Sequence, residues 1–208
     1  GELARLAQAD LKLTTRLTVV PVAGWRRAMY FEETGLPFIP PSPNLRSIES
    51  LFHYPGLCLF EGTALSVGRG SDAPFEQIGA SWLDTATVLA GLRAARLPGV
   101  RFQAARFTPR RPGDGKFADT VLTGIRLRVV DRAAYDPTAT AVTLLSLIQA
   151  RHPDRIGWRD EWFDRLAGGS GLRLAIQAGK PAAEIVRGWQ DDLTKFQDRR
   201  RSFLLYGP

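Results

Sequence analysis

Apolar and polar residues alternate in two short segments near the middle of the chain, residues 100–104 and 125–129. A period of two residues is typical of strands that bury one face and leave the other in water. The segment Thr108–Lys116 between them is rich in proline, glycine and basic residues, which indicates an exposed loop. We therefore expect two strands that pair antiparallel across this loop.

Helical spacing and capping residues predict several helices after these strands and one before them. Ser81 is expected to cap a helix that runs to about Arg96, and Asp136–Pro137 is a typical helix start. Further helices are expected over residues 160–167, from 170 to near 179, and from 181 onwards. The last of these carries an apolar stripe that is expected to lie in the core: Ile185, Trp189, Leu193 and Phe196.

The N-terminal quarter predicts a short helix around Leu3 and Leu6 and a strand over Leu17–Val22, where β-branched residues are frequent. Leu57–Phe60 is a continuous apolar run, which predicts a strand buried on both faces that ends just before Glu61. The whole pattern predicts an α/β fold. More specifically, we expect an α+β C-terminal region of mixed or antiparallel strands and helices.

An unusual concentration of proline, glycine and polar residues lies between residues 38 and 75. Its motifs are Phe-Ile-Pro-Pro-Ser-Pro-Asn, Tyr-Pro-Gly, Phe-Glu-Gly-Thr and Gly-Arg-Gly. Prolines fix φ and remove a donor, while glycines permit turns or the close approach of a ligand. Packing alone rarely requires this combination, so the segment predicts a binding site. Glu61 is its candidate carboxylate, and Arg69 can reach either a ligand carboxylate or Glu61.

Composition sets limits on the fold and the chemistry. With 208 residues and 44% hydrophobic content, the chain can form one well-buried domain and part of another. The single cysteine, Cys58, lies in an apolar run and is expected to be a small buried hydrophobe. No His, Cys and carboxylate spacing predicts a metal site, and no complete nucleotide-binding motif predicts a cofactor. No apolar run is long enough for a membrane span, and no signal peptide is recognisable.

The net charge of +7 is concentrated in one segment. Arg93–Arg132 contains ten Lys and Arg residues and three Asp residues, so its local excess of +7 equals that of the whole chain. A nucleic-acid partner is not expected, because no recognition motif or set of stacking aromatics accompanies the charge. The segment either attracts an acidic substrate or is simply a solvated basic surface.

The motifs between residues 38 and 75, continued by Gly79, Ala80 and Trp82, resemble the bacterial exo-β-N-acetylmuramidase family. Later segments extend the resemblance to the end of the chain: residues 130–132, 152–153, 163–168 and 203–206, with Trp158. The resemblance implies a Rossmann-like domain followed by an auxiliary domain, with the active site in the cleft between them. Residues 1–45 would be the end of the first domain and residues 46–208 the second, so most of the Rossmann-like half is expected to be missing.

The resemblance implies an exo-acting glycosidase that removes N-acetylmuramic acid from the non-reducing ends of peptidoglycan fragments. Glycoside hydrolysis usually needs two carboxyl groups. Glu61 is the candidate for one, and the other is expected from the missing half, so the chain alone is expected to be inactive. The alternative is that Glu61 only braces its loop through Arg69.

Several further residues are candidates for substrate binding: Arg69, Ser42, Asn44, Thr63, Ser66, Tyr54 and Trp82. The hydroxyl and amide side chains can instead close turns on their own backbone, and the aromatic rings can belong to the core. The expected partner is a peptidoglycan-derived muropeptide or disaccharide, whose carboxylates the basic segment would attract. The family implies a cell-envelope location, periplasmic or secreted. The alternative function is a non-catalytic peptidoglycan-binding or scaffolding module, and no oligomeric state is indicated.

Overall fold

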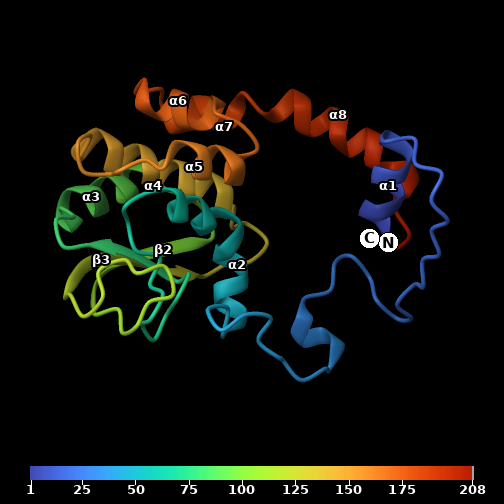
Figure 1. Cartoon of the computed structure of the whole chain (residues 1–208), viewed down its shortest axis with the longest axis horizontal. Coiled ribbons are helices and arrows are strands. Elements are labelled where there is room, and N and C mark those ends of the chain that lie inside the picture. The colour runs from blue at the N-terminus through green and yellow to red at the C-terminus, as the bar shows by residue number, and fades with distance from the viewer. Residues whose placement is uncertain (208) are drawn as a thin grey trace. The chain divides into compact units, whose positions relative to one another are not determined.

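A computed structural model describes residues 1–207 and divides the chain into two compact units, each with its own internal contacts. The larger unit comprises Pro40–Arg187, and the smaller unit combines Gly1–Ile39 with the residues from Gly188 onwards. Helices and a small antiparallel sheet together make a mixed α/β fold, as the sequence predicts (Figure 1).

The larger unit contains a three-stranded sheet in the order β1-β3-β2, with both pairs antiparallel. Its strands are β1 (Gln77–Ala80), β2 (Val100–Phe107) and β3 (Leu122–Val129). In the β2–β3 pair Phe102 lies opposite Leu127, and Arg101 lies opposite Arg128. The strand pair expected from the alternating pattern is therefore confirmed, and the short strand β1 is an addition to it.

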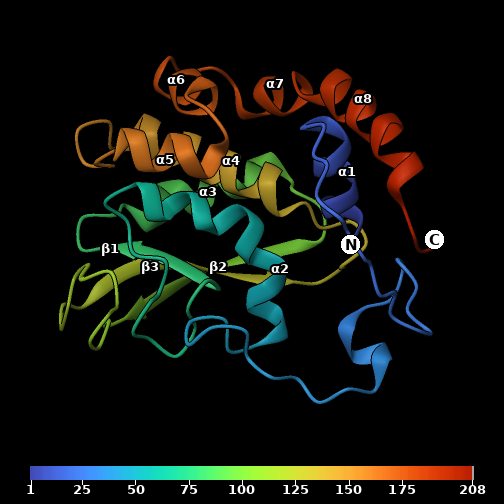
Figure 2. The ribbon, with the colours of Figure 1, turned by 45° about the vertical axis from the view of Figure 1, so that its right-hand side comes forward.

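The helices of the larger unit are α2 (Ile48–Leu57), α3 (Thr85–Ala95), α4 (Pro137–Arg151), α5 (Asp160–Ala167), α6 (Gly171–Gln177) and α7 (Ala182–Arg187). Helices α3 and α4 lie over one face of the sheet (Figures 1 and 2). Helices α6 and α7 pack against α4, and α5 packs against α6. The core between these layers is aliphatic and aromatic, and its fully buried side chains include Phe60, Phe75, Ile78, Ile125, Leu127, Leu145 and Phe163.

Capping residues explain where the main helices begin and end. Asp136 accepts a hydrogen bond from the Ala139 amide at 2.9 Å and so caps α4 as predicted. Helix α3 is capped by Asp84, which accepts from Thr87 N at 3.1 Å, so the prediction of Ser81 as the cap is wrong. Asp84 is the cap because it lies one residue before the helix, where its carboxylate faces the free amides of the first turn.

The apolar run Leu57–Phe60 forms no strand, and that prediction is wrong. Leu57 ends α2, and the following residues form a 3₁₀ helix, η2 (Cys58–Gly62). A short helical segment that is buried on most sides has the same continuous apolar pattern as a buried strand, so periodicity could not separate them. Glu61 therefore lies in the last turn of a 3₁₀ helix, and not at the carboxyl end of a strand.

The smaller unit contains α1 (Glu2–Asp10), η1 (Phe31–Thr34), α8 (Gln190–Arg200) and η3 (Arg201–Phe203). Helix α1 is confirmed, but Leu17–Val22 forms no strand, so that prediction is wrong. The segment has suitable residues but no neighbouring strand within the described residues with which to exchange backbone hydrogen bonds. Polar contacts link the ends of this unit: Glu2 Oε1 accepts hydrogen bonds from Arg27 Nη2 at 2.6 Å and from the Leu205 amide at 2.8 Å.

The continuous helix expected from Pro181 onwards is interrupted between Arg187 and Gln190, which makes the separate helices α7 and α8. Its apolar stripe is only partly in the core, because Ile185 is buried but Leu193 and Phe196 are 45% and 41% exposed. The stripe fails as a core prediction because the two halves belong to different compact units. Among residues 1–207, no helix combines the length and the apolar character that crossing a bilayer requires.

Candidate functional site

Glu61 and Arg69 form a half-buried ion pair in the larger unit. Arg69 Nε donates to Glu61 Oε1 at 2.8 Å, and Arg69 Nη2 contacts the same oxygen. Within residues 1–207, Glu61 Oε2 and Arg69 Nη1 make no hydrogen bond, and the two side chains are 16% and 23% exposed. The pair therefore keeps one carboxylate oxygen and one guanidinium nitrogen available to a ligand.

Tyr54 belongs to the same surface. This residue lies in α2, is 39% exposed and meets the ring of Phe75 edge-on, with the centroids 4.9 Å apart. The guanidinium of Arg69 lies 5.1 Å from the centroid of the same Phe75 ring, which is buried. Burial, followed by the nearby thiol of Cys58 and carboxylate of Glu61, raises the pKa of Tyr54. We name the surface made by Tyr54, Glu61 and Arg69 the Glu61 surface.

Cys58 lies at the edge of this surface in η2, where it is half-buried. Its Sγ contacts the Pro55 carbonyl at 3.5 Å. Burial, with a smaller contribution from the negative charge of Glu61, raises the pKa of the thiol. The residue is therefore a poor nucleophile at neutral pH, in keeping with its expected role as a small apolar side chain.

Lys116 forms hydrogen bonds with the backbone segment that carries Glu61. Its ammonium donates to the carbonyl oxygens of Leu65 at 2.9 Å, Glu61 at 3.2 Å and Phe60 at 3.4 Å. The residue is only 8% exposed, and burial lowers its pKa to about 8. The sequence placed Lys116 in an exposed loop, and for this side chain that prediction is wrong.

The two glycines around Arg69 are required by local geometry. Gly68 and Gly70 have φ values of +76° and +77°, a region that residues with a Cβ rarely adopt. A Cβ on Gly70 would lie 2.5 Å from the carbonyl oxygen of Arg110, whose amide donates to the Gly70 carbonyl at 2.7 Å. The glycines thus let this loop pack closely against the loop Thr108–Lys116 while Arg69 turns toward Glu61.

Thr63 and Ser66 are buried, and their hydroxyl groups are engaged within the protein. Thr63 Oγ1 donates to the Phe60 carbonyl at 2.8 Å and accepts from the Leu65 amide at 3.1 Å. Ser66 Oγ accepts from the Gly68 amide at 3.1 Å. The geometry therefore favours the loop-closing alternative for both residues over contact with a substrate.

Ser42 and Asn44 lie in a turn of their own. Ser42 Oγ accepts from the Asn44 amide at 3.3 Å, and the Leu45 amide donates to the Ser42 carbonyl at 3.0 Å. Trp82 also packs away from Glu61, since its ring meets His152 edge-on with the centroids 5.1 Å apart. Of the predicted site residues, the structure brings together Tyr54, Glu61 and Arg69.

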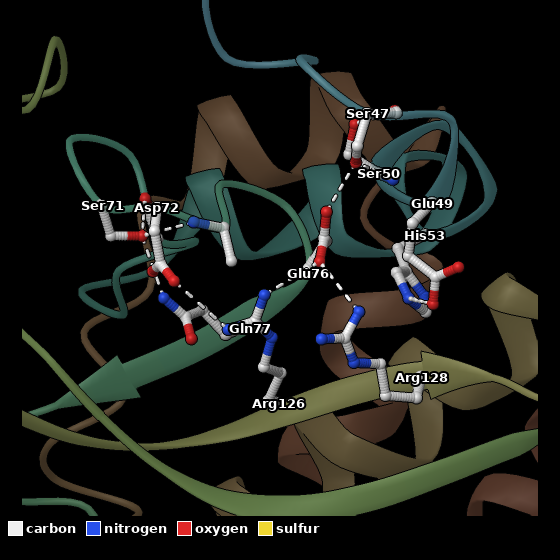
Figure 3. A network of polar contacts seen from close by, with 12 residues as sticks. Ser47, Glu49, Ser50, His53, Ser71, Asp72, Glu76, Gln77, Arg126 and Arg128 are labelled. Carbon is white, nitrogen blue, oxygen red and sulfur yellow. Dashed lines mark hydrogen bonds and ion pairs between the residues drawn. The ribbon is translucent and has the colours of Figure 1, made fainter.

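A second carboxylate, Glu76, is the centre of a polar network that the sequence reasoning missed (Figure 3). Glu76 is 6% exposed, and its Oε1 accepts from Ser47 Oγ at 2.5 Å. Its Oε2 accepts from Arg126 Nη2 at 3.2 Å and lies 3.7 Å from Arg128 Nη1. Because Ser47 also caps α2, this network ties the start of that helix to strand β3.

His53 extends the network into the interior, where its side chain is fully buried. Nδ1 lies 2.7 Å from the hydroxyl of Tyr135, and Nε2 lies 3.4 Å from Glu49 Oε1. Burial lowers the pKa of His53, although the nearby carboxylates of Glu49 and Glu76 partly oppose that effect. Within residues 1–207, no group of three or more His, Cys, Asp or Glu side chains is arranged to hold a metal ion.

Comparison with protein families matches nearly the whole chain to one family. Residues 52–206 match the model described as exo-beta-N-acetylmuramidase NamZ, C-terminal, and residues 1–49 match the corresponding N-terminal model. The first match covers the Glu61 surface, the loop Thr108–Lys116 and Glu76 with its two arginine partners, whereas Ser47 and Glu49 lie in the second match.

Individual relatives agree with this match. The chain is 36% identical over 207 residues to the peptidoglycan beta-N-acetylmuramidase NamZ of Bacillus subtilis (strain 168), with 99% of this chain and 49% of that relative covered. Two crystal structures of DUF1343 family proteins from Bacteroides fragilis NCTC 9343 are also similar. One has a TM-score of 0.87 at 25% identity, and the other 0.72 at 28%. They cover 99% and 100% of this chain, which spans 55% of each of them.

Proposed function

Because the chain belongs to the exo-β-N-acetylmuramidase NamZ family, we propose that it is part of an enzyme that releases N-acetylmuramic acid from the non-reducing ends of peptidoglycan fragments. The chain spans about half the length of its B. subtilis relative, so its contribution is one wall of the active-site cleft. The observation that carries this assignment is the Glu61 surface, where a carboxylate oxygen, a guanidinium nitrogen and an exposed aromatic ring lie together.

Glu61 is the proposed catalytic carboxylate of this wall. A carboxylate that is paired with a guanidinium is ionised, so it accepts hydrogen bonds or a proton and does not donate one. Glycosidases use one such ionised carboxylate as nucleophile or base, opposite a protonated carboxylic acid. We assign Glu61 to the ionised role through Oε2, and the acid to a residue outside this chain.

Arg69 and Tyr54 are the proposed substrate-binding groups beside it. N-acetylmuramic acid carries a lactyl carboxylate, and Arg69 Nη1 is a charged donor with no partner within the described residues. The partly exposed ring of Tyr54 offers a flat apolar surface to a sugar ring. The nearby basic segment Arg93–Arg132 would attract muropeptide or disaccharide substrates, whose carboxylates are negative.

The domain division and the location are further parts of the proposal. We assign residues 1–45 to the end of a Rossmann-like catalytic domain and residues 46–208 to the auxiliary domain. The change from the N-terminal to the C-terminal family match between residues 49 and 52 lies close to this boundary. The compact units instead divide at Pro40, and the residues from Gly188 onwards belong to the smaller unit. A substrate derived from peptidoglycan would place the protein in the cell envelope, either periplasmic or secreted.

A second candidate function is a peptidoglycan-binding or scaffolding module without a catalytic group. The observation that favours it is the double contact of Arg69 with Glu61 Oε1, because a carboxylate that only braces a loop would be held in the same way. In that case the Glu61 surface would bind the glycan and leave its glycosidic bond intact.

The test uses the natural protein that contains this chain and measures release of N-acetylmuramic acid from a chromogenic muramide. Glu61→Gln keeps the shape of the side chain and removes its charge, so we expect kcat/KM to fall by about 100-fold or more. The matched control is Glu161→Gln on the exposed surface of α5, which should leave the rate unchanged. A Glu61→Gln rate within about threefold of the parent would remove Glu61 from catalysis and favour the binding module.

A further inference from the structure

The ammonium of Lys116 occupies a cage made by three backbone carbonyls of the segment Phe60–Leu65. The three acceptors match the three N–H donors of a protonated lysine, and the distances are 2.9, 3.2 and 3.4 Å. One of these carbonyls belongs to Glu61 itself. The Lys116 ammonium is therefore bonded directly to the backbone of Glu61, whose side chain forms part of the Glu61 surface.

The loop that delivers Lys116 is conformationally costly. Two residues that follow Lys116, Phe117 and Asp119, have φ values of +54° and +57°, and Arg111 before it has +46°. Each such non-glycine residue is strained relative to a relaxed backbone. The loop that carries Lys116 therefore contains three residues in a backbone region that residues with a Cβ rarely adopt.

From this arrangement we infer that Lys116 is a positioning residue, which holds η2 so that Glu61 and Arg69 meet in the geometry that the glycan requires. The inference rests on the proposed function of the Glu61 surface. Lys116 has no part in the chemistry and acts only through the backbone of residues 60–65. Loss of its proton leaves an amine with two N–H groups, so at least one of the three carbonyls must lose its donor.

The charged groups that face Lys116 come from its own loop and from three neighbouring segments. Asp114 and Glu61 favour the ammonium, whereas Arg69 and Arg159 oppose it. Asp114 is especially suited to this role because its Oδ2 is buried and makes no hydrogen bond within residues 1–207. Removing the charge of Asp114 should therefore make Lys116 lose its proton at a lower pH.

Cys58 gives a test that needs no substrate, because it lies in η2 and is half-buried. We would measure the rate of Cys58 alkylation by iodoacetamide at pH 7 in the natural protein and in Lys116→Met. Loss of the three hydrogen bonds should release η2 and raise the rate about tenfold or more. The control is Arg111→Ala, an exposed residue of the same loop, which should leave the rate unchanged.

The second readout is the pH profile of kcat/KM on the chromogenic muramide. The parent should lose activity as the pH rises through about 8, because Lys116 then loses its proton. Asp114→Asn should move this loss of activity to lower pH, which a purely structural role for the loop would not do. If the pH at which activity is lost stays unchanged, the inference is overturned.

The alkylation result separates this inference from the proposed function. A raised Cys58 rate in an enzyme that releases no muramic acid would support the role of Lys116 and contradict the muramidase assignment. A rate within about twofold of the parent would overturn the inference even if the enzyme is active. If Lys116→Met does not fold, the same measurement is made on the parent protein. Its Cys58 alkylation rate, divided by the fraction of thiolate, should rise as the pH passes through about 8. A constant value would contradict the inference.

Discussion

Glu61 and Glu76 are two arginine-paired carboxylates in the same unit, and their environments differ in one decisive respect. Both oxygens of Glu76 are engaged, Oε1 by Ser47 and Oε2 by Arg126, and the residue is almost completely buried. Among residues 1–207, partners engage one oxygen of Glu61 and leave the other without a hydrogen bond, and its side chain remains within reach of solvent. The number of unused acceptor positions, more than the presence of an arginine, therefore distinguishes a bracing carboxylate from one that can meet a ligand.

The difference originates in the elements that hold each residue. Glu76 directly precedes β1, and the pairing of Gln77 with Arg126 brings Leu127 opposite Glu76, with its partners Arg126 and Arg128 on either side of that residue. Glu61 lies at the end of a 3₁₀ helix, and its partner Arg69 comes from a glycine-flanked loop. A sheet register fixes one pair, whereas loop contacts and Lys116 fix the other.

The largest effect on stability should come from Glu76→Ala. This change leaves Arg126 and Arg128 without their shared carboxylate and removes the acceptor of Ser47, so we expect a loss of about 3 kcal/mol in the free energy of unfolding. Glu61→Ala should cost about 1 kcal/mol or less, because its pair is partly solvated. Urea unfolding of both variants measures the two values. Equal losses would abolish the distinction between the two carboxylates.

An intermediate effect is expected for Gly70→Ala, which tests the loop that carries Arg69. The new Cβ would meet the Arg110 carbonyl oxygen at 2.5 Å on a backbone with φ of +77°, so stability should fall by about 2 kcal/mol. Gly113→Ala is the matched control, because nothing lies within 4 Å of its Cβ and its φ is not positive. If the two variants unfold at the same urea concentration, the close packing of the two loops is not required.

The smallest effect should be a pH dependence of stability that comes from His53 in the Glu76 network. Burial lowers the pKa of His53 below its ordinary value of 6.5, so below that pH the unfolded chain binds a proton that the folded chain does not. Stability should therefore fall as the pH drops below about 6.5. Thermal unfolding at pH 7.5 and about 5.5 should show a smaller drop for His53→Gln than for the parent. As a control, Glu61→Gln should show the same drop in thermal stability as the parent. If His53→Gln also shows the parent's drop, His53 is not the cause.

Local patterns were sufficient for part of the fold. The alternation in residues 100–104 and 125–129 gave β2 and β3, and Asp136–Pro137 gave the start of α4, because each signal lies within the element that it predicts. The Glu61–Arg69 pair was also foreseeable as an alternative, since the glycines beside Arg69 indicate a loop that can turn back. Four-residue β1 was missed because a strand so short has too few positions to show a period.

Contacts between distant segments account for the rest. Nothing near Lys116 in the sequence indicates that its ammonium reaches carbonyls at residues 60–65, and a glycine-rich basic loop normally predicts exposure. Glu76 gave no signal either, because its partners are Ser47 before α2 and two arginines of β3. Such sites depend on the assembled sheet, and single-sequence periodicity carries no information on it.

The most direct test is a crystal structure of the natural protein that contains this chain, with N-acetylmuramic acid bound. We expect a sugar hydroxyl within roughly 2.7 Å of Glu61 Oε2 and the lactyl carboxylate at Arg69 Nη1, with Glu76 unchanged in its network. A sugar bound elsewhere, with both Glu61 and Arg69 untouched, would contradict the claim that this pair faces the glycan.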